Sequence, residues 1–471
     1  MTAKSATETA TLQLRTAKDR LSISERFAYG LGDFGSNMVW QMVTTFLLFY
    51  YTDVAGLAAV TISIMFLINR FWDILWGLFI GWRADQTHTR FGAYRPYLLY
   101  GSVPFAVTFV LAFSLPPLSS ALALGYAFVS LFLLETTYNI VNVPYASMIT
   151  VITENEQEHA NLASSRFLGT IIATLLVSGA TPGILAGFTN QRQAFQDVTL
   201  IYAAIAFTAF LLCFRFTHER VAIQSQQRLR LAEVVQVLRV NGPLFITVIA
   251  IVLLFTGFTI RNSAALYYFK YNLGHEELAG LFFVAFSLLG IVGAFIAPPV
   301  ARRLDKRNTA ILFLAIFALG GLIWYGLGDS LALALLGAAL GGIGMVGTAV
   351  MIIAMIPDTV DYAEWRSGLR APGIAMAINV SSTKLATAVG TALVGGGLAI
   401  VRYIPNVTQS SATLVGIRNL MSLFPTISAV IAIVAMLFYP LTRTKSAQIV
   451  AELEGNRNNS KGDQGAPCVS G

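Results

Sequence analysis

Some ionisable side chains lie deep within long apolar stretches of the chain, where they are well placed to do chemistry. The candidates, in chain order, are Asp33, Arg70, Asp73, Glu135, Arg261 and Lys384. A charge at membrane depth is costly, so it generally faces a water-filled cavity or a partner. We therefore expect these residues to bind a polar ligand, to couple to an ion, or to pair with one another.

Helical spacing gathers further polar side chains into two stripes. The first stripe, spaced by four residues, comprises Asp33, Asn37 and Gln41. The second, spaced by three and four residues, comprises Glu135, Tyr138, Asn139 and Asn142. Residues at such spacing share one helix face. Amides and carboxylates can bind hydroxyl groups while an aromatic ring covers the apolar side of a sugar; the alternative is a polar network that only joins helices.

Apolar helices must position these side chains. The chain is 56% hydrophobic and 12% charged, whereas a soluble domain carries roughly 25% charged residues. A membrane-spanning helix needs about 20 mostly apolar residues. Such segments occupy 24–50, 57–82, 96–115, 121–149, 163–188, 198–217, 243–269, 278–300, 309–327, 331–356, 372–400 and 415–440. The sequence predicts an all-α polytopic membrane protein with twelve transmembrane helices.

Basic residues concentrate in alternate loops, at 83–96, 215–240 and 301–308. Because Lys and Arg favour the cytoplasmic side, both termini are expected in the cytoplasm of a multi-pass protein of the inner (plasma) membrane. The net charge of +7 then indicates orientation rather than nucleic-acid binding.

The long basic loop falls midway and predicts two six-helix halves. The expected organisation is a cytoplasmic tail at 1–23, a half at 24–217, a central cytoplasmic loop at 218–242, a second half at 243–440 and a disordered tail at 441–471. The sequence GWRAD at 81–85 is echoed by ARRLD at 301–305. Repeated halves of this kind are typical of the major facilitator fold.

Several function classes find no support in the sequence. The two cysteines, Cys213 and Cys468, are far apart, and the four histidines lack metal-ligand spacing. No nucleophile elbow or phosphate-binding loop is present. We therefore expect no metal, no cofactor and no enzymatic activity. The loops and tails are too short for the effector domain of a membrane sensor.

Seven motifs resemble, in order along the chain, those of the glycoside–pentoside–hexuronide:cation symporter family, to which the melibiose permease belongs. They are YGLGDFGSN, FYYTDVAGL, NRFWDILWG, DQTHTRFGAYRPYLL, YNIVNVPYASM, IPDTVDYAEWRSGLRAPGIA and YIPNVTQS. VNVPYAS and NGPLF most resemble the family's glucuronide carriers. The resemblance implies a twelve-helix symporter that imports a small sugar or sugar acid with H⁺ or Na⁺ by alternating access.

The resemblance also implies roles for individual positions. Asn37 and Asn142 match two aspartates that bind sugar in the melibiose permease. Site residues of that protein are also matched here by Tyr138, Arg166 and Lys384. Asn139 and Asp33 lie on the same stripes; Asp33 either binds substrate or ties its helix to a neighbour.

Two departures from the family pattern concern substrate charge. Asn37 and Asn142 remove carboxylates that would repel an anion, and Arg261 and Lys384 supply positive charge. A sugar acid is therefore favoured over a neutral galactoside. Two roles stay open for Arg261: a two-bond grip on a substrate carboxylate, or an ion pair with Glu135.

A third departure concerns the coupling ion. Asp73 matches one of two cation-site aspartates, but Gly77 replaces the other and offers no ligand. Proton coupling needs a single titratable carboxylate, and burial favours its neutral form. We expect H⁺ rather than Na⁺, with Asp73 as first candidate and Glu135 as second. The alternatives are an uncoupled sugar uniporter and a Na⁺-coupled symporter of a neutral glycoside.

Charged residues close to the expected cytoplasmic surface suggest a gate of ion pairs that holds the outward-facing state. They are Asp85, Arg90, Arg95, Asp358, Asp361, Glu364 and Arg366. Exchanging such pairs for water keeps two states within a few kcal/mol of one another. The alternative is that these are solvated loop charges.

Overall fold

The computed structural model describes residues 21–153, 155–220, 231–327, 330–369 and 371–463. Contacts between residues divide the chain into two compact units. The first unit comprises 1–226 with the short stretches His275–Gly280 and Ile404–Val407. The second comprises Gln227–Gly274, Leu281–Tyr403 and Thr408–Gly471. The unit boundary falls in the long basic loop.

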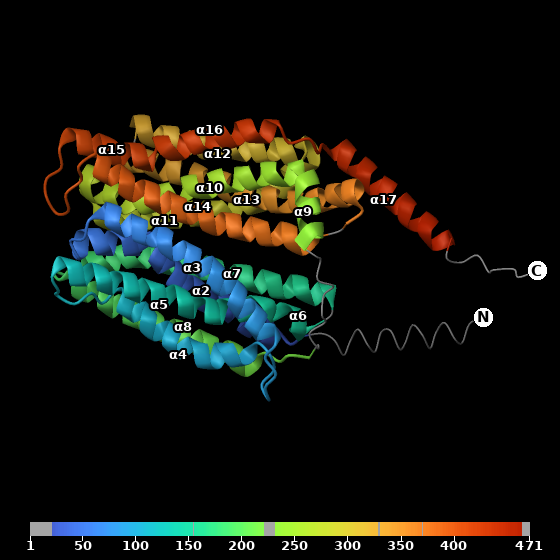
Figure 1. The fold of residues 1–471 in the computed structure, drawn as a ribbon. Coiled ribbons are helices and arrows are strands. Elements are labelled where there is room, and N and C mark those ends of the chain that lie inside the picture. Colours follow the sequence, from blue (N-terminus) through green and yellow to red (C-terminus); the bar gives the residue numbers. More distant parts are fainter. Residues whose placement is uncertain (1–20, 154, 221–230, 328–329, 370, 464–471) are drawn as a thin grey trace, which may run out of the picture. The chain divides into compact units, whose positions relative to one another are not determined.

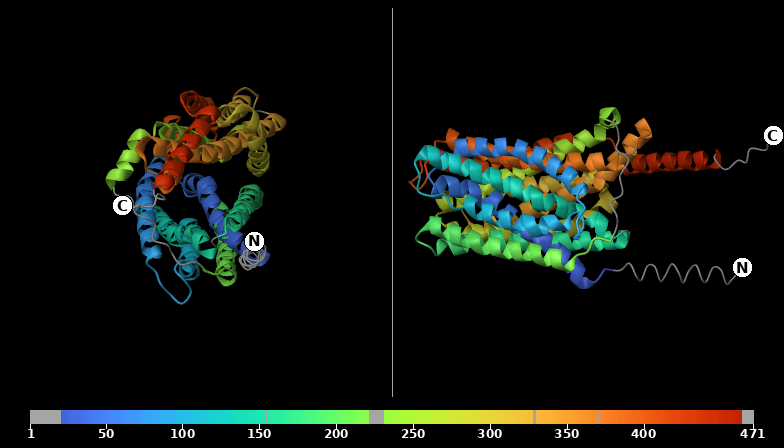
Figure 2. Two further views of the ribbon diagram at one scale, coloured as in Figure 1. Left: turned by 90° about the vertical axis from the view of Figure 1, so that its right-hand side faces the viewer. Right: turned by 60° about the horizontal axis from the view of Figure 1, so that its bottom comes forward.

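Helices make up the first unit and run side by side within it (Figure 1). They are α2 (Ile23–Met42), α3 (Ala59–Asp85), α4 (Arg95–Ala112), α5 (Ser120–Ser147), α6 (Ile149–Ile152), α7 (Glu156–Ala186) and α8 (Gln191–Phe216). Helix α2 continues into two π-helical turns, η1 (Val43–Leu47) and η2 (Tyr50–Val54). Seen end-on, the long helices of this unit have roughly parallel axes (Figure 2).

The second unit is built in the same way. Its helices are α9 (Leu231–Val240), α10 (Gly242–Tyr267), α11 (Ala279–Leu304), α12 (Lys306–Leu327), α13 (Leu331–Ser367), α14 (Pro372–Ile400), α15 (Ser411–Met421), α16 (Leu423–Leu437) and α17 (Arg443–Asp463). Helix α10 also ends in a π-helical turn, η3 (Tyr268–Leu273). The short 3-10 helix η4 (Glu276–Leu278) precedes α11.

The prediction of an all-α polytopic membrane protein is confirmed. Ten helices of the described chain are long and apolar enough to cross a membrane. The other two predicted segments correspond to α2 with its π turns and to α4. Helix α13 runs to Ser367, past the predicted end at 356, so Asp358, Asp361 and Glu364 lie on the helix.

The ends of the chain differ in part from expectation. Residues 443–463 form α17, where a polar composition predicted disorder. Residues 1–20, 221–230 and 464–471 lie outside the described residues, and with them most of the predicted N-terminal tail, part of the central loop and the end of the C-terminal tail.

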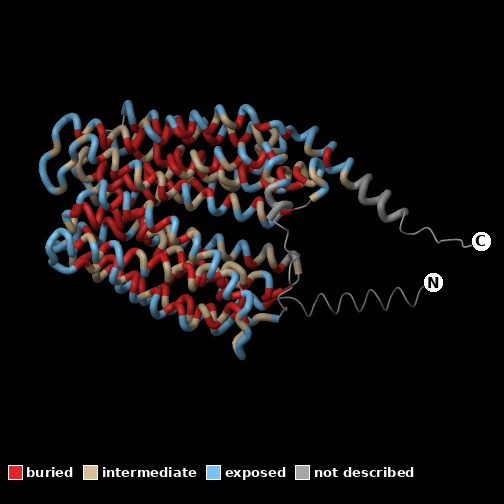
Figure 3. Tube along the Cα trace, in the orientation of Figure 1, coloured by how far each residue is buried: buried red, intermediate tan, exposed pale blue. Residues whose placement is uncertain are grey.

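Along most of the long helices, buried residues alternate with exposed ones (Figure 3). Small residues allow close approach between helices, as is typical of membrane bundles. A Cβ added to Gly169 of α7 would collide with the carbonyl oxygen of Gly30 in α2. A Cβ added to Gly342 of α13 would likewise collide with the carbonyl of Phe286 in α11. Both helix pairs therefore depend on glycine at these positions.

Glu219, in the loop after α8, closes one end of the first unit. Its carboxylate accepts hydrogen bonds from the backbone N–H groups of Ala93, Tyr94 and Arg95, at 2.7, 2.8 and 2.9 Å. The first N–H groups of a helix lack intrahelical partners and carry partial positive charge. The Glu219 carboxylate thus caps α4 and joins the loop after α8 to the start of α4.

Glu219→Gln should lower the free energy of unfolding by roughly 1–2 kcal/mol, because the amide lacks the charge that complements the helix terminus. Thermal unfolding of the purified protein in detergent measures the change. The matched control is Asp197→Asn, which removes a charge from α8 that forms no hydrogen bond or ion pair with the described residues. Equal thermal shifts for the two variants would contradict the capping role.

Candidate functional site

The polar stripe of α2 binds the neighbouring helix α7. Arg166 Nε and Nη2 donate to the two carboxylate oxygens of Asp33, at 2.9 and 3.3 Å. Asn37 Nδ2 donates to Thr170 Oγ1 at 3.0 Å, and Gln41 Nε2 donates to Ser178 Oγ at 2.8 Å. Each of these hydrogen bonds joins a residue of the predicted stripe to α7. Of the two roles left open for Asp33, the structure provides the tie between helices.

Five half-buried side chains of the first unit form a polar and aromatic face: Asn37, Trp40, Tyr138, Asn142 and Arg166. The Trp40 and Tyr138 rings stack at 5.4 Å between centroids. Asn142 Nδ2 donates to Ser36 Oγ at 3.1 Å, and Arg166 lies over the Tyr145 ring at 5.2 Å. We define these five as the polar face. It offers amides, a guanidinium and flat apolar rings, which are the groups that a sugar ring requires.

Beneath this face lies a buried charge cluster that joins α3 and α5. Arg70 Nη1 donates to Asp73 Oδ2 at 2.9 Å, and Arg70 Nη2 lies 3.9 Å from Glu135 Oε1. Asn139 Nδ2 donates to Asp73 Oδ1 at 2.6 Å. The exposed fraction is 7% for Arg70, 0% for Asp73, 4% for Glu135 and 1% for Asn139. One guanidinium therefore serves two carboxylates away from water.

Gly77 gains a structural meaning from this cluster. A Cβ at Gly77 would lie 3.3 Å from Asn139 Oδ1, which has no hydrogen-bond partner among the described residues. The Asn139 amide thus lies in the space beside Gly77, and the Arg70 guanidinium lies against the Asp73 carboxylate. The second carboxylate of the family pattern is absent at Gly77. The Asn139 amide and the Arg70 guanidinium lie beside Asp73 instead.

A small cavity adjoins Glu135. It has a volume of about 10 Å³ and is lined by Val39, Trp40, Val43, Leu134, Glu135 and Tyr138. A space of this size is near the minimum that holds one water molecule. It connects the buried carboxylate with the Trp40–Tyr138 pair of the polar face.

Arg261 lies inside the second unit and is 1% exposed. Its guanidinium lies 4.2 Å from the centroid of the Phe317 ring. A Cβ at Gly321 or Gly341 would lie 2.7 Å from Nη2 or Nη1. Among the described residues none of its three side-chain nitrogens has a hydrogen-bond partner. Two glycines and an aromatic face therefore make room for a cation that the described chain leaves unpaired.

The expected ion pair of Arg261 with Glu135 has a competitor, since Glu135 lies beside Arg70 in its own unit. Lys384, the other predicted cation of the second unit, is half-buried on α14.

The predicted gate residues mostly contact their own unit. Asp85 Oδ1 accepts from the Tyr94 hydroxyl at 2.8 Å, and Arg95 Nη2 donates to the Phe214 carbonyl at 2.7 Å. Burial and the hydrogen bond to Asp85 both raise the pKa of Tyr94, so its hydroxyl remains a donor. Arg90 lies over Phe91 at 4.6 Å, and Arg366 over Trp365 at 5.5 Å.

Asp358, on α13, pairs with Lys306 Nζ at 2.7 Å. Asp361 and Glu364 follow on the same helix. Lys306 was not predicted as a gate residue, although it lies in the basic loop that the sequence analysis singled out.

Other charged pairs at the same end of the first unit were also missed. Arg220 donates two hydrogen bonds of 2.8 Å to the Glu25 carboxylate. Arg26 donates two hydrogen bonds to the Glu158 carboxylate, at 2.9 and 2.7 Å. Their charges are visible in the sequence, but they fall at helix ends more than a hundred residues apart, so spacing gives no signal for the pairing. In the described part of the chain no group of three His, Cys, Asp or Glu residues could hold a metal ion.

Two units built of apolar helices, with a polar face and buried charges inside the first and a buried guanidinium inside the second, are typical of a membrane transporter of the major facilitator type. The chain matches the family described as MFS/sugar transport protein over residues 28–443. It belongs to this family of transporters and is not an enzyme.

Individual relatives agree with the family. The chain is 33% identical to the isoprimeverose transporter of Lactiplantibacillus pentosus over 444 residues, which cover 93% of this chain and 92% of the relative. It is 31% identical to the glucuronide carrier protein homolog of Escherichia coli, over 91% of this chain and 95% of the relative. The crystal structure of the nucleoside transporter NupG shares the fold, with a TM-score of 0.61, 15% identity and coverage of 88% and 100%. The family match and the two sequence relatives confirm the predicted membership of the glycoside–pentoside–hexuronide:cation symporters.

Gly341→Ala should destabilise the second unit by about 1–3 kcal/mol, because the added methyl would overlap the Arg261 guanidinium. Arg261→Ala should relieve that overlap, so the double variant should lose less stability than the sum of the single variants. Thermal unfolding in detergent gives the three values. Gly326→Ala, where a Cβ has open space, is the control; additive losses would contradict the predicted contact.

Proposed function

We propose that this protein imports a sugar acid or related glycoside together with a proton, by alternating access across the inner (plasma) membrane, with both termini in the cytoplasm. The observation that carries the proposal is the buried charge cluster of Arg70, Asp73 and Glu135 directly beneath the polar face. An ion-binding group and a sugar-binding face then share helix α5. Basic alternate loops support the orientation.

The polar face supports a sugar as substrate. The Trp40 and Tyr138 rings offer an apolar platform, and Asn37, Asn142 and Arg166 offer hydrogen bonds around it. Relatives named for isoprimeverose and for glucuronide agree with a glycoside of this size class. All five residues touch neighbouring helices as well, so substrate binding and helix packing would be linked.

Buried charge supports an acidic sugar in particular. An unpaired guanidinium in a low-dielectric interior creates a positive potential that is weakly screened. Arg261 would therefore favour an anionic substrate through its field, without touching it. We favour this role over the direct two-bond grip because Gly321, Gly341 and Phe317 lie close around the guanidinium.

Charge balance supports coupling to one monovalent cation. Among these three residues, Arg70 carries one positive charge, and Asp73 and Glu135 carry two negative charges when ionised. One proton balances the three. Asp73 accepts short bonds from Arg70 and Asn139, at 2.9 and 2.6 Å, whereas Arg70 is 3.9 Å from Glu135. We therefore place Glu135 ahead of Asp73 for proton binding.

The direct test is uptake into proteoliposomes. Labelled glucuronide and a neutral pentoside or galactoside are compared under an imposed pH gradient and then under a Na⁺ gradient. Accumulation of glucuronide driven by the pH gradient is expected. Accumulation of the neutral sugar driven by Na⁺ would overturn both the acidic substrate and the proton. Equilibration without accumulation under either gradient would favour the uncoupled uniporter.

Glu135→Gln should abolish accumulation under a pH gradient while sugar exchange between the two sides continues, because the amide removes the carboxylate charge permanently. Asp73→Asn should reduce exchange as well, since it also disrupts the pairing of Arg70. Gradient-driven uptake and counterflow are measured on the same vesicles. Accumulation that persists in Glu135→Gln would eliminate Glu135 as the coupling group.

Arg261→Leu should raise the half-saturation concentration for the acidic sugar at least severalfold and leave that of its neutral analogue nearly unchanged. The hydrophobic replacement avoids a new buried polar group. Competition uptake with both sugars provides the ratio. Equal weakening of both sugars would show that Arg261 acts through structure alone.

A further inference from the structure

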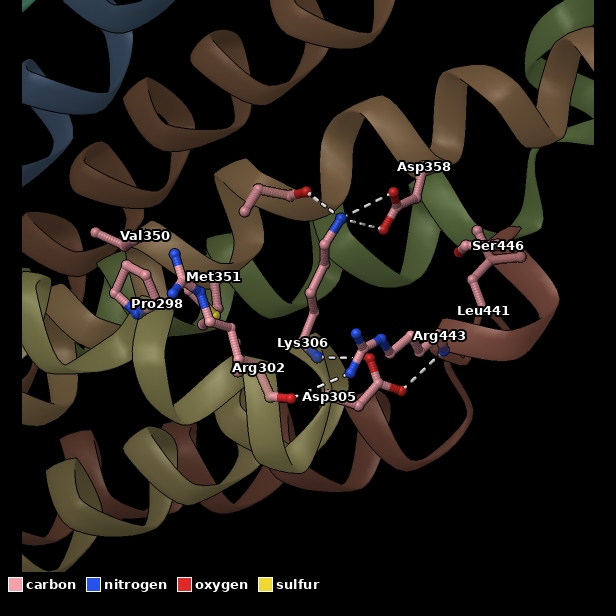
Figure 4. A pocket seen from close by; sticks show the side chains of 12 residues that line it. Pro298, Arg302, Asp305, Lys306, Val350, Met351, Asp358, Leu441, Arg443 and Ser446 are labelled. Carbon is pink, nitrogen blue, oxygen red and sulfur yellow. Dashed lines mark hydrogen bonds and ion pairs between the residues drawn. The ribbon is translucent and has the colours of Figure 1, made fainter. Parts of the chain in front are cut away.

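A second polar cavity lies at one end of the second unit, far along the chain from the charge cluster. It has a volume of about 400 Å³ and is formed by the end of α11, the start of α12, the later part of α13 and the segment that leads into α17. Figure 4 shows its lining, in which Arg302, Lys306 and Arg443 surround the space together with Asp305 and Asp358. None of these residues belongs to the polar face.

Of the three cationic side chains in the lining, Lys306 is paired with a carboxylate of the described chain, whereas Arg302 and Arg443 are not. Lys306 Nζ is held by Asp358, at 2.7 and 2.9 Å, and by the Ala354 carbonyl at 3.0 Å. The guanidinium of Arg443 donates to the backbone carbonyl of Arg302 at 3.1 Å. Within the described residues neither Arg302 nor Arg443 forms an ion pair with a carboxylate. Both guanidinium groups thus keep donors for another acceptor.

Asp305 links two segments of the lining through backbone hydrogen bonds. One carboxylate oxygen accepts from the backbone N–H of Lys306 at 2.6 Å, and the other accepts from that of Arg443 at 3.1 Å. Its backbone has a φ of 75°, a left-handed conformation that is uncommon outside glycine. The carboxylate therefore serves the backbone of two segments, and it holds the chain bearing Arg443 against the chain bearing Arg302.

The rest of the lining is largely apolar. Pro298, Val350, Met351 and Leu441 contribute to the walls, and Arg302 extends along them toward Pro298 and Met351 (Figure 4). Ser446 adds a hydroxyl. A ligand that fits such a cavity combines an oxyanion, which guanidinium groups bind through paired hydrogen bonds, with a less polar portion.

We propose that this cavity binds a phosphate-bearing ligand through Arg302 and Arg443. The two arginines supply the donors for the oxyanion, and the apolar walls around Pro298 and Met351 accommodate the less polar remainder of the ligand. Two sources supply this chemistry: the headgroup of an anionic phospholipid and a soluble phosphate compound. The site is separate from the proposed transport function, and its ligand is bound rather than transported.

Protection of arginines from chemical modification tests the proposal on the unaltered full chain. The purified protein is treated with phenylglyoxal, with inorganic pyrophosphate or phosphatidylglycerol present or absent, and modified peptides are quantified by mass spectrometry. Modification of Arg302 and Arg443 should slow severalfold when a probe is bound. Arg303, an exposed neighbour that does not line the cavity, is the internal control and should react at an unchanged rate.

The two probes separate the sources. Protection by pyrophosphate in detergent identifies a soluble phosphate site, and protection by phosphatidylglycerol alone, with phosphatidylcholine as control lipid, identifies a headgroup site. The absence of protection by both probes would overturn the proposal. Equal protection of Arg303 would overturn it too, because general screening by an anion would then explain the effect.

Variants give a second measurement. The double variant Arg302→Gln with Arg443→Gln should weaken binding of the protecting probe roughly tenfold or more, since two charge-assisted contacts are lost. Arg303→Gln should change binding by less than about twofold, because an exposed charge at a distance is screened. A loss of the same size in Arg303→Gln would contradict a site built by the two arginines.

Discussion

The cost of burying charge away from water is the constraint on which the first unit depends. Arg70 and Asp73 are a single helical turn apart, and their pair would be marginal on an exposed surface. Inside the bundle, neither group can be removed without leaving the other uncompensated. Glu135 and Asn139 extend the pair onto α5, so the same contacts that satisfy the charges also join α3 to α5 and support the aromatic pair above them.

The second unit meets the same constraint in a different way. Arg261 has a ring face and two glycines around it in place of the carboxylates that surround Arg70. An aromatic face offsets part of the cost of a buried cation, but less than a carboxylate does. The two units therefore accommodate a buried guanidinium by different means, with carboxylates around Arg70 and with a ring face and glycines around Arg261.

The sequence was most informative where a single physical rule decides the outcome. Hydrophobic length identified the helices, and spacing identified the stripes of Asp33 and Glu135, because both depend on local geometry. It was less informative for partners: Arg166 was placed in the site, but its two bonds to Asp33 depend on the packing of α2 against α7. Polar composition suggested disorder after residue 441, whereas residues 443–463 are helical. Pairings such as Glu219 with the start of α4 join distant loops and leave no periodic signal.

The π-helical turns at the ends of α2 and α10 add chain length without disturbing the helix that precedes them. A turn closed by i to i+5 bonds contains one residue more than an α-helical turn. These turns contain Tyr50 and Tyr51 in the first unit and Tyr268 and Phe269 in the second. Because the first π turn begins only at Val43, the added residues lie beyond Asp33, Asn37 and Gln41, and the register of that polar stripe is unaffected.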